Sequence, residues 1–332
     1  MNRMKIWLIL TPISIVVLGA VSWFLLAWGE CRKPDVYNAD YGKPLVLGSQ
    51  IVTNRFNEYG INVVDGEGSF STKDSSDQRM PSAIAFIDEN FVYWSNADRK
   101  LVLLGKNGET RFISGQQIPT SQDVIELVPV RSGLLINTNK YVLDARGLKD
   151  YSRSSAYRVD LVSGDIKQIE NVISARGDST SDIIAVITQN GDFQLINNTG
   201  ESTLIPNMHV DPSNWYAWDF DPSHHLIAFY LYDKKHWDAL NIFNTTGDLI
   251  KKIKISRVWD IVFQPSRNEI WVATEPGGWK IDTQDIAIYD LMGTYRGIRY
   301  RTIGLELHRP FLPVEDWMKE IIASHNDNNN QK

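Results

Sequence analysis

Residues 215–255 read WYAWDFDPSHHLIAFYLYDKKHWDALNIFNTTGDLIKKIKI, and this stretch contains one complete structural repeat. Four short apolar runs are separated by turn residues such as Asp-Pro-Ser and Thr-Gly-Asp. The last run alternates isoleucine and lysine, as a half-exposed strand does. We therefore interpret the stretch as four consecutive β-strands, covering 215–219, 226–232, 239–243 and 249–255.

The second strand of this unit recurs along the chain at a regular interval. The matching runs begin at Phe91, Leu134, Ile184, Ile227 and Ile270, which are 43, 50, 43 and 43 residues apart. Four-stranded repeats of about 40 to 50 residues are typical of β-propeller blades. The period therefore predicts an all-β propeller.

A second series marks a tight hairpin turn between two strand-like segments. Glycine suits the positive φ that such a turn demands. The glycines of this series are Gly66, Gly108, Gly164, Gly200, Gly247 and Gly293. Six turns predict six blades, and seven are expected if residues 34–60 and 300–312 combine in a closing blade. A β-sandwich or two small β-domains are the alternative folds.

Two kinds of segment resemble known propeller families. The strand–turn–strand segment YRVDLVSGDIKQI, at 157–169, resembles the repeat of YVTN and quinoprotein-type propellers. The turns FDPS at 220–223 and FQPS at 263–266 resemble those of TolB and WD40-like propellers, although the Gly-His and Trp-Asp signature pairs are missing from their expected WD40 places. The resemblance implies a propeller fold. It implies no particular activity, because these superfamilies include scaffolds, ligand binders and enzymes.

An uncharged apolar run, residues 6–28, precedes the repeats. A helix needs about 20 apolar residues to cross the hydrocarbon core of a bilayer. We expect residues 1–5 to be a short cytoplasmic N-terminus, 6–28 a single-pass transmembrane signal anchor and 29–44 a linker. The body then lies outside the cytoplasm, in the periplasm of a bacterium. A cleaved signal peptide is the alternative, but its apolar core is usually shorter.

The propeller is expected to span residues 45–312. After it, residues 313–332 are predicted to form a helix of about ten residues, with apolar side chains at near-helical spacing, and then a polar tail from residue 327. The single cysteine, Cys31, excludes an intrachain disulfide, so the fold depends on packing.

Composition argues against several functions. The formal net charge is −6, whereas a nucleic-acid binder needs clustered lysine and arginine. A G-x-S-x-G nucleophile motif and a phosphate-cradling glycine loop are both missing from the sequence. We therefore predict no catalytic residue and no cofactor.

Two small sets of residues are candidates for a site. His224 and His225, with Asp219, are weak metal candidates, but their spacing matches no recognised metal motif, so no metal is predicted. Trp237 and Trp279 fall in loops between strands two and three of adjacent blades. Equivalent loops emerge on one face of a propeller, so these two tryptophans are candidates for binding a partner.

The anchor, the repeats and the lack of a catalytic signature together favour a protein–protein interaction module in the cell envelope. A membrane-bound assembly factor and an immunity-type protein both fit this hypothesis. The alternative is an enzyme or small-molecule binder that uses the central channel of the propeller.

Overall fold

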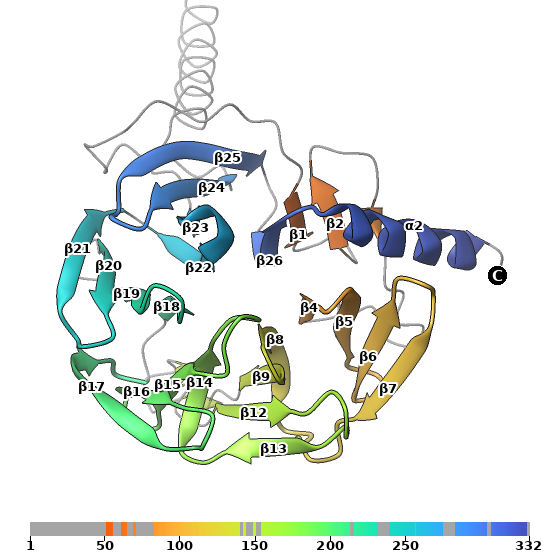
Figure 1. Cartoon of the computed structure of the whole chain (residues 1–332), viewed down its shortest axis with the longest axis horizontal. Coiled ribbons are helices and arrows are strands. Elements are labelled where there is room, and N and C mark those ends of the chain that lie inside the picture. The colour runs from red at the N-terminus through yellow and green to blue at the C-terminus, as the bar shows by residue number, and fades with distance from the viewer. Residues whose placement is uncertain are drawn as a thin grey trace, which may run out of the picture.

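The computed structural model describes residues 51–55, 61–64, 69–70, 83–139, 142–143, 149–150, 154–212, 216–231, 239–255, 257–274, 283–303 and 307–330. Their strands form four-stranded antiparallel sheets that are arranged in a ring, which is an all-β propeller (Figure 1). This ring confirms the predicted fold class and excludes the alternative of a β-sandwich.

Five blades are each built from one continuous part of the chain. Blade 1 contains β4 (Ile84–Ile87), β5 (Asn90–Ser95), β6 (Lys100–Gly105) and β7 (Thr110–Ser114). Blade 2 contains β8 (Asp123–Val130), β9 (Gly133–Asn139), β12 (Ser155–Val159) and β13 (Ile166–Ile169), and the short pair β10 (Val142–Leu143) and β11 (Lys149–Asp150) lies between β9 and β12 in the sequence. Blade 3 contains β14 (Val172–Arg176), β15 (Ile184–Thr188), β16 (Asp192–Ile196) and β17 (Ser202–His209).

Blade 4 contains β18 (Tyr216–Asp221), β19 (Leu226–Leu231), β20 (Ala239–Asn244) and β21 (Leu249–Lys254). Blade 5 contains β22 (Val258–Gln264), β23 (Glu269–Thr274), β24 (Thr283–Asp290) and β25 (Tyr295–Ile303), with the 3-10 turn η1 (Pro265–Arg267) after β22. In each blade the first strand is innermost in the ring and the last is outermost (Figure 1).

The two ends of the described chain meet in one further four-stranded sheet, which we call the closing sheet. Its order is β26 (Leu307–Pro313), β1 (Ile51–Arg55), β2 (Ile61–Val64) and β3 (Ser69–Phe70). The prediction of six or seven blades in series is therefore corrected to five continuous blades. The remaining sheet is shared by both chain ends, because β26 pairs with β1 antiparallel at Val52↔Leu312 and Asn54↔His308.

Both predicted periodic series have a structural counterpart. The five recurring apolar runs are β5, β9, β15, β19 and β23, the second strand of each continuous blade. The glycines from Gly108 to Gly293 each lie, with positive φ, in the hairpin that joins the third and fourth strands of one blade. Gly66 lies outside the described residues.

Side-chain amides hold two of these hairpins in shape. Asn197 Oδ1 accepts hydrogen bonds from the backbone N–H of Thr199 and Glu201, and Asn244 Oδ1 does the same for Thr246 and Asp248. Asparagine at this place satisfies the backbone donors of a tight turn. The two N-x-T sequences of the chain are therefore explained by turn geometry.

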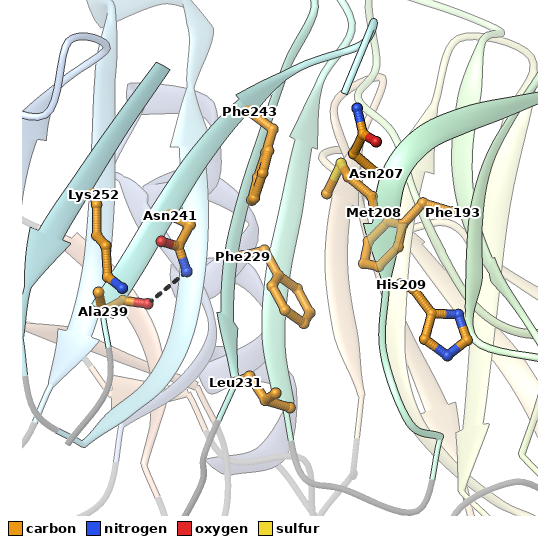
Figure 2. A pocket seen from close by; sticks show the side chains of 10 residues that line it. All are labelled: Phe193, Asn207, Met208, His209, Phe229, Leu231, Ala239, Asn241, Phe243 and Lys252. Carbon is orange, nitrogen blue, oxygen red and sulfur yellow. Dashed lines mark hydrogen bonds between the residues drawn. The ribbon is translucent and has the colours of Figure 1, made fainter. Parts of the chain in front are cut away.

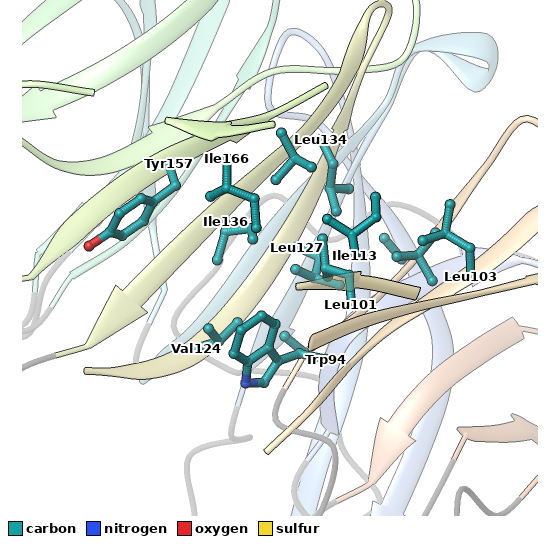
Figure 3. Close-up of a cluster of buried hydrophobic side chains, with 14 of the residues drawn as sticks. Trp94, Leu101, Leu103, Ile113, Val124, Leu127, Leu134, Ile136, Tyr157 and Ile166 are labelled. Atoms are coloured by element: carbon teal, nitrogen blue, oxygen red, sulfur yellow. The ribbon is translucent and has the colours of Figure 1, made fainter. Parts of the chain in front are cut away.

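The core is divided into six apolar clusters, one at each junction of neighbouring sheets. Figure 3 shows the junction of blades 1 and 2, where Trp94 and Leu101 of blade 1 meet Val124 and Ile136 of blade 2. Since alternate residues of a strand point to opposite faces, each blade supplies one face to each of its two junctions. Packing between sheets therefore stabilises every blade from both sides.

The C-terminal helix α2 (Asp316–Asn330) covers the junction of blade 1 and the closing sheet. Met318, Ile321 and Ile322 are buried there against Phe86 and Phe91 of blade 1. The helix has 15 residues and includes residues 327–330, so it is longer than the ten or so residues predicted and replaces most of the expected polar tail.

The predicted anchor, residues 6–28, lies outside the described residues, as do the N-terminus 1–5 and the linker 29–44. In the described part of the chain, every helix is too short or too polar to span a bilayer. The transmembrane segment therefore stays a prediction.

Two glycines with almost the same backbone conformation give a matched test of the packing between blades. Gly247 has φ +84°, and a Cβ there would lie 1.8 Å from the carbonyl oxygen of Pro206 in blade 3. Gly200 has φ +86° and open space around its Cα. We expect Gly200→Ala to lower the free energy of unfolding by about 1–2 kcal/mol, because alanine is strained in the left-handed conformation. Gly247→Ala is expected to lower it by at least about 1 kcal/mol more, because its Cβ would also clash with blade 3.

Urea unfolding of both variants measures this difference. Equal losses of unfolding free energy would contradict the close contact between the Gly247 turn and blade 3.

Candidate functional site

The innermost strands of five sheets each send one charged side chain to the centre of the ring. We call this set the central cluster. Its members are Glu126 on β8, Arg176 on β14, Asp219 on β18, Asp260 on β22 and Arg309 on β26. The innermost strand of blade 1, β4, has the uncharged sequence IAFI.

Arg309 contacts all three carboxylates of the central cluster. Its Nε donates to both carboxylate oxygens of Asp260, at 2.8 Å each. Its Nη1 lies 3.0 Å from Glu126 Oε1 and 3.4 Å from Asp219 Oδ1. Its Nη2 donates to the carbonyl oxygens of Trp218 and Ile261. One guanidinium of the closing sheet therefore connects blades 2, 4 and 5.

Arg176 completes the connection through blade 3. Its Nη1 lies 2.5 Å from Glu126 Oε2, and its Nε donates to the carbonyl oxygen of Trp218 at 3.0 Å. Asn137 of β9 supports the same carboxylate, because its Nδ2 donates to Glu126 Oε2 at 2.9 Å. The central cluster is thus a continuous network of ion pairs and hydrogen bonds.

The central cluster is largely shielded from solvent, with side-chain exposure from 8% for Asp219 to 21% for Asp260. Burial raises the pKa of Asp219 to about 6, against the opposing effect of Arg309 and Arg176. Burial also raises the pKa of Asp260 despite its contact with Arg309. Three carboxylates face two guanidinium groups, so desolvation is only partly offset by pairing.

Two of the innermost strands that carry the central cluster, β8 and β22, contain a β-bulge. The pairing of β8 with β9 shifts between Val124 and Glu126, and that of β22 with β23 shifts between Val258 and Asp260. A β-bulge re-aims a side chain in this way. The bulged residues themselves, Ile125 and Trp259, are 47% and 40% exposed.

Sequence reasoning missed four of the five members of the central cluster. They are far apart in the sequence and share no short motif, because each comes from a different sheet. One signal was present: Trp218-Asp219 and Trp259-Asp260 repeat a charged residue inside an otherwise apolar first strand. A carboxylate at that place, in successive blades, indicates a polar ring centre.

The three weak metal candidates do not converge. Asp219 pairs with arginines in the central cluster, whereas His224 lies in the turn between β18 and β19, with its Nδ1 2.6 Å from Asp221 Oδ2. His225 occupies the left-handed position of the same turn, with φ 56°. Across the described residues, no group of three or more His, Cys, Asp or Glu side chains is arranged to hold a metal ion.

Trp237 and Trp279 lie outside the described residues, but the strands that flank them are described. The segment with Trp237 begins after Leu231, which pairs with Tyr216 at the start of β18. The segment with Trp279 begins after Thr274, which pairs with Val258 at the start of β22. Leu231 and Thr274, the last described residues before these two segments, therefore both lie at the face where the innermost strands begin, which we call the entry face.

Comparison with known proteins gives the fold alone. The chain matches no protein-family model and no curated protein. Among solved structures, it is similar to TolB from Acinetobacter baumannii, with a TM-score of 0.48 and 12% identity over 78% of this chain and 67% of that one. It is also similar to the Cps50 (Swd1) β-propeller domain of Myceliophteria thermophila, with a TM-score of 0.46 and 12% identity over 75% and 74% of the two chains. A third similar structure is that of streptogramin B lyase, with a TM-score of 0.37 and 10% identity over 72% of this chain and 94% of that one.

We expect Arg309→Met to destabilise the protein strongly. The substitution keeps an unbranched apolar stem but removes the guanidinium, so it leaves three buried carboxylates with Arg176 alone, and breaking a buried ion pair costs about 3–5 kcal/mol. Arg296→Met is the matched control, because Arg296 makes a 2.6 Å ion pair with Asp290 while its side chain is 53% exposed. The control variant is expected to lose less than about 1 kcal/mol of unfolding free energy.

Denaturant unfolding of both variants tests the importance of the central cluster. Similar losses for Arg309→Met and Arg296→Met would show that the cluster adds nothing beyond a surface ion pair.

The raised pKa of Asp219 predicts a pH dependence of stability. The folded state binds this proton more tightly than the unfolded chain, in which an aspartate titrates near its ordinary value. The contribution is therefore fully present below about pH 4 and is lost as the pH rises through about 6. Relative to Asp219→Asn, the wild-type protein is expected to lose roughly 1–3 kcal/mol of unfolding free energy between about pH 4 and pH 7.

Urea unfolding at several pH values measures the difference between the two proteins. If the unfolding free energy of the wild type stays constant or rises relative to that of Asp219→Asn over this pH range, the raised pKa is contradicted.

Proposed function

We propose that this chain is a membrane-tethered propeller that binds a protein partner in the cell envelope through its entry face. Residues 6–28 act as the tether, with the body outside the cytoplasm. The observation that carries the proposal is the exposure of Trp259, an aromatic side chain of the innermost strand, beside the point where the segment with Trp279 departs.

Two apolar side chains support the choice of the entry face. Trp259 is 40% exposed and Ile125 is 47% exposed, and each lies near the start of its innermost strand. Leu231 and Thr274, the last described residues before Trp237 and Trp279, lie at the same face. Tryptophan is enriched among the residues that contribute most to protein–protein binding.

The central cluster supports a surface site over a site at the centre of the ring. Arg176 and Arg309 take up the carboxylates that a substrate or a metal ion in the channel would use. A small molecule would have to separate these buried ion pairs before it bound, at a cost of several kcal/mol. The channel enzyme or small-molecule binder is therefore the second candidate.

The role of the interface is proposed at the level of class. A rigid ring that presents loops from several blades suits a membrane-bound assembly factor. It suits equally an immunity-type protein that neutralises an envelope toxin. The identity of the crosslinked partner distinguishes the two.

In-cell crosslinking of the tagged full-length chain, followed by purification from membranes and mass spectrometry, tests the proposal. We expect one partner at a constant ratio to the propeller. Alanine at Trp237, Trp259 or Trp279 is expected to weaken its binding about tenfold or more without lowering thermal stability.

Met292→Ala is the control, because Met292 is 64% exposed but lies in the turn between the outer strands of blade 5. It is expected to leave binding unchanged. A solitary monomer from the crosslinked membranes, or equal binding by the tryptophan variants, would overturn the proposal and favour the channel alternative.

A further inference from the structure

A groove opens between blades 3 and 4, lined by residues of their second, third and fourth strands. We call it the interblade groove. Its volume is about 220 Å³, and Figure 2 shows the side chains around it. They are Phe193, Asn207, Met208 and His209 of blade 3, and Phe229, Leu231, Ala239, Asn241, Phe243 and Lys252 of blade 4.

The wall from blade 3 is made by an irregularity of β17. Asp192 pairs with His209 and Gln194 pairs with Leu204, so one residue of β16 faces four residues of β17, 205–208. Most bulges add a single residue to one strand. Here β17 has three additional residues, and the bulged stretch includes Asn207 and Met208, which line the groove.

Two further features fit this bulge. Asn207 has φ 62°, in the left-handed region where asparagine is enriched among residues other than glycine. The Gly247 turn of blade 4 fits against the carbonyl of Pro206, with room for no Cβ. Local sequence and packing against blade 4 therefore both favour the bulged path of β17.

The floor of the groove is aromatic. Phe193 is 1% exposed and meets Phe229 edge to face, with ring centroids 5.3 Å apart. Phe243 of β20 belongs to the wall from blade 4 (Figure 2). Its cross-strand neighbour, Leu249, is 51% exposed, so the apolar surface continues beyond the groove.

The wall from blade 4 is basic, although the whole chain carries a net charge of −6. Lys252 and Lys254 lie directly opposite Asn241 and Ala239 in the pairing of β20 with β21, so they share the face that lines the groove. Lys252 is exposed and makes no ion pair within the part of the chain that the structure describes. A carboxylate is the group that an unpaired ammonium beside an apolar groove attracts.

We propose that the interblade groove binds an aromatic side chain carried on an acidic segment of the protein partner. The volume favours a single side chain over a whole small molecule, because ligand pockets usually enclose about 300–1,000 Å³. Apolar surface with a basic rim matches an aromatic anchor flanked by aspartate or glutamate. This inference rests on the proposed function and names the chemistry of the partner.

The test measures binding of labelled synthetic peptides to the purified full-length protein by fluorescence anisotropy. One peptide carries a phenylalanine between aspartates and glutamates. In the second peptide alanine replaces the phenylalanine, and in the third lysines replace the acids. Only the first is expected to bind, and its affinity is expected to fall as the salt concentration rises.

Lys252→Glu is expected to weaken binding of the first peptide about fivefold or more, since the acidic peptide would then be repelled by a carboxylate instead of attracted by an ammonium group. Its matched control is Lys167→Glu, an exposed lysine on the outer strand β13 of blade 2, which is expected to change binding less than twofold. Equal effects of the two substitutions, equal binding of the three peptides, or no binding at millimolar concentration would each overturn the proposal.

The same variants separate this inference from the proposed function. If Lys252→Glu retains the crosslinked partner and the peptide does not bind, the groove site is wrong and the interaction module stands. If the peptide binds as expected and crosslinked membranes give a solitary monomer, the groove site stands and the proposed envelope interaction is wrong.

Discussion

Closure of the ring is the constraint on which the rest of this structure depends. The closing sheet takes β26 from one end of the chain and β1 to β3 from the other. Because a propeller blade is stabilised on both faces by its neighbours, an open ring would leave two apolar faces without a partner. Arg309 lies on the innermost strand of this sheet and reaches carboxylates of blades 2, 4 and 5. The strand that pairs the two chain ends therefore also carries the arginine that links the carboxylates at the centre.

The sequence allowed the fold to be predicted because a repeated unit has a repeated signal. The interval of 43 to 50 residues between the second strands and the glycines of the outer hairpins are local features, and the five strands and the glycines from Gly108 to Gly293 were placed in the correct strand or turn. A closing blade from residues 34–60 and 300–312 was considered only for a seven-bladed ring, and the strands that actually form the closing sheet, β1 to β3 and β26, were harder to predict. That sheet depends on pairing between residues such as Val52 and Leu312, which are separated by almost the whole chain.

The candidate sites were much less predictable, for a physical reason. The central cluster combines one residue from each of five sheets, so no short motif contains it, and Asp219 alone was noticed. The interblade groove arises from the three additional residues of β17, and the sequence 205–208 (IPNM) gives no sign of its pairing partner. By contrast, the histidines that stand next to one another in the sequence serve a turn.

The protein's own charges fill the centre of the ring, and we propose that partners bind on its surface. A high-resolution crystal structure of the full-length protein purified from its native membrane would show which groups occupy the centre. We expect Arg309 and Arg176 in contact with Glu126, Asp219 and Asp260. Arginines drawn apart around a metal ion or an organic ligand at the centre would contradict this expectation.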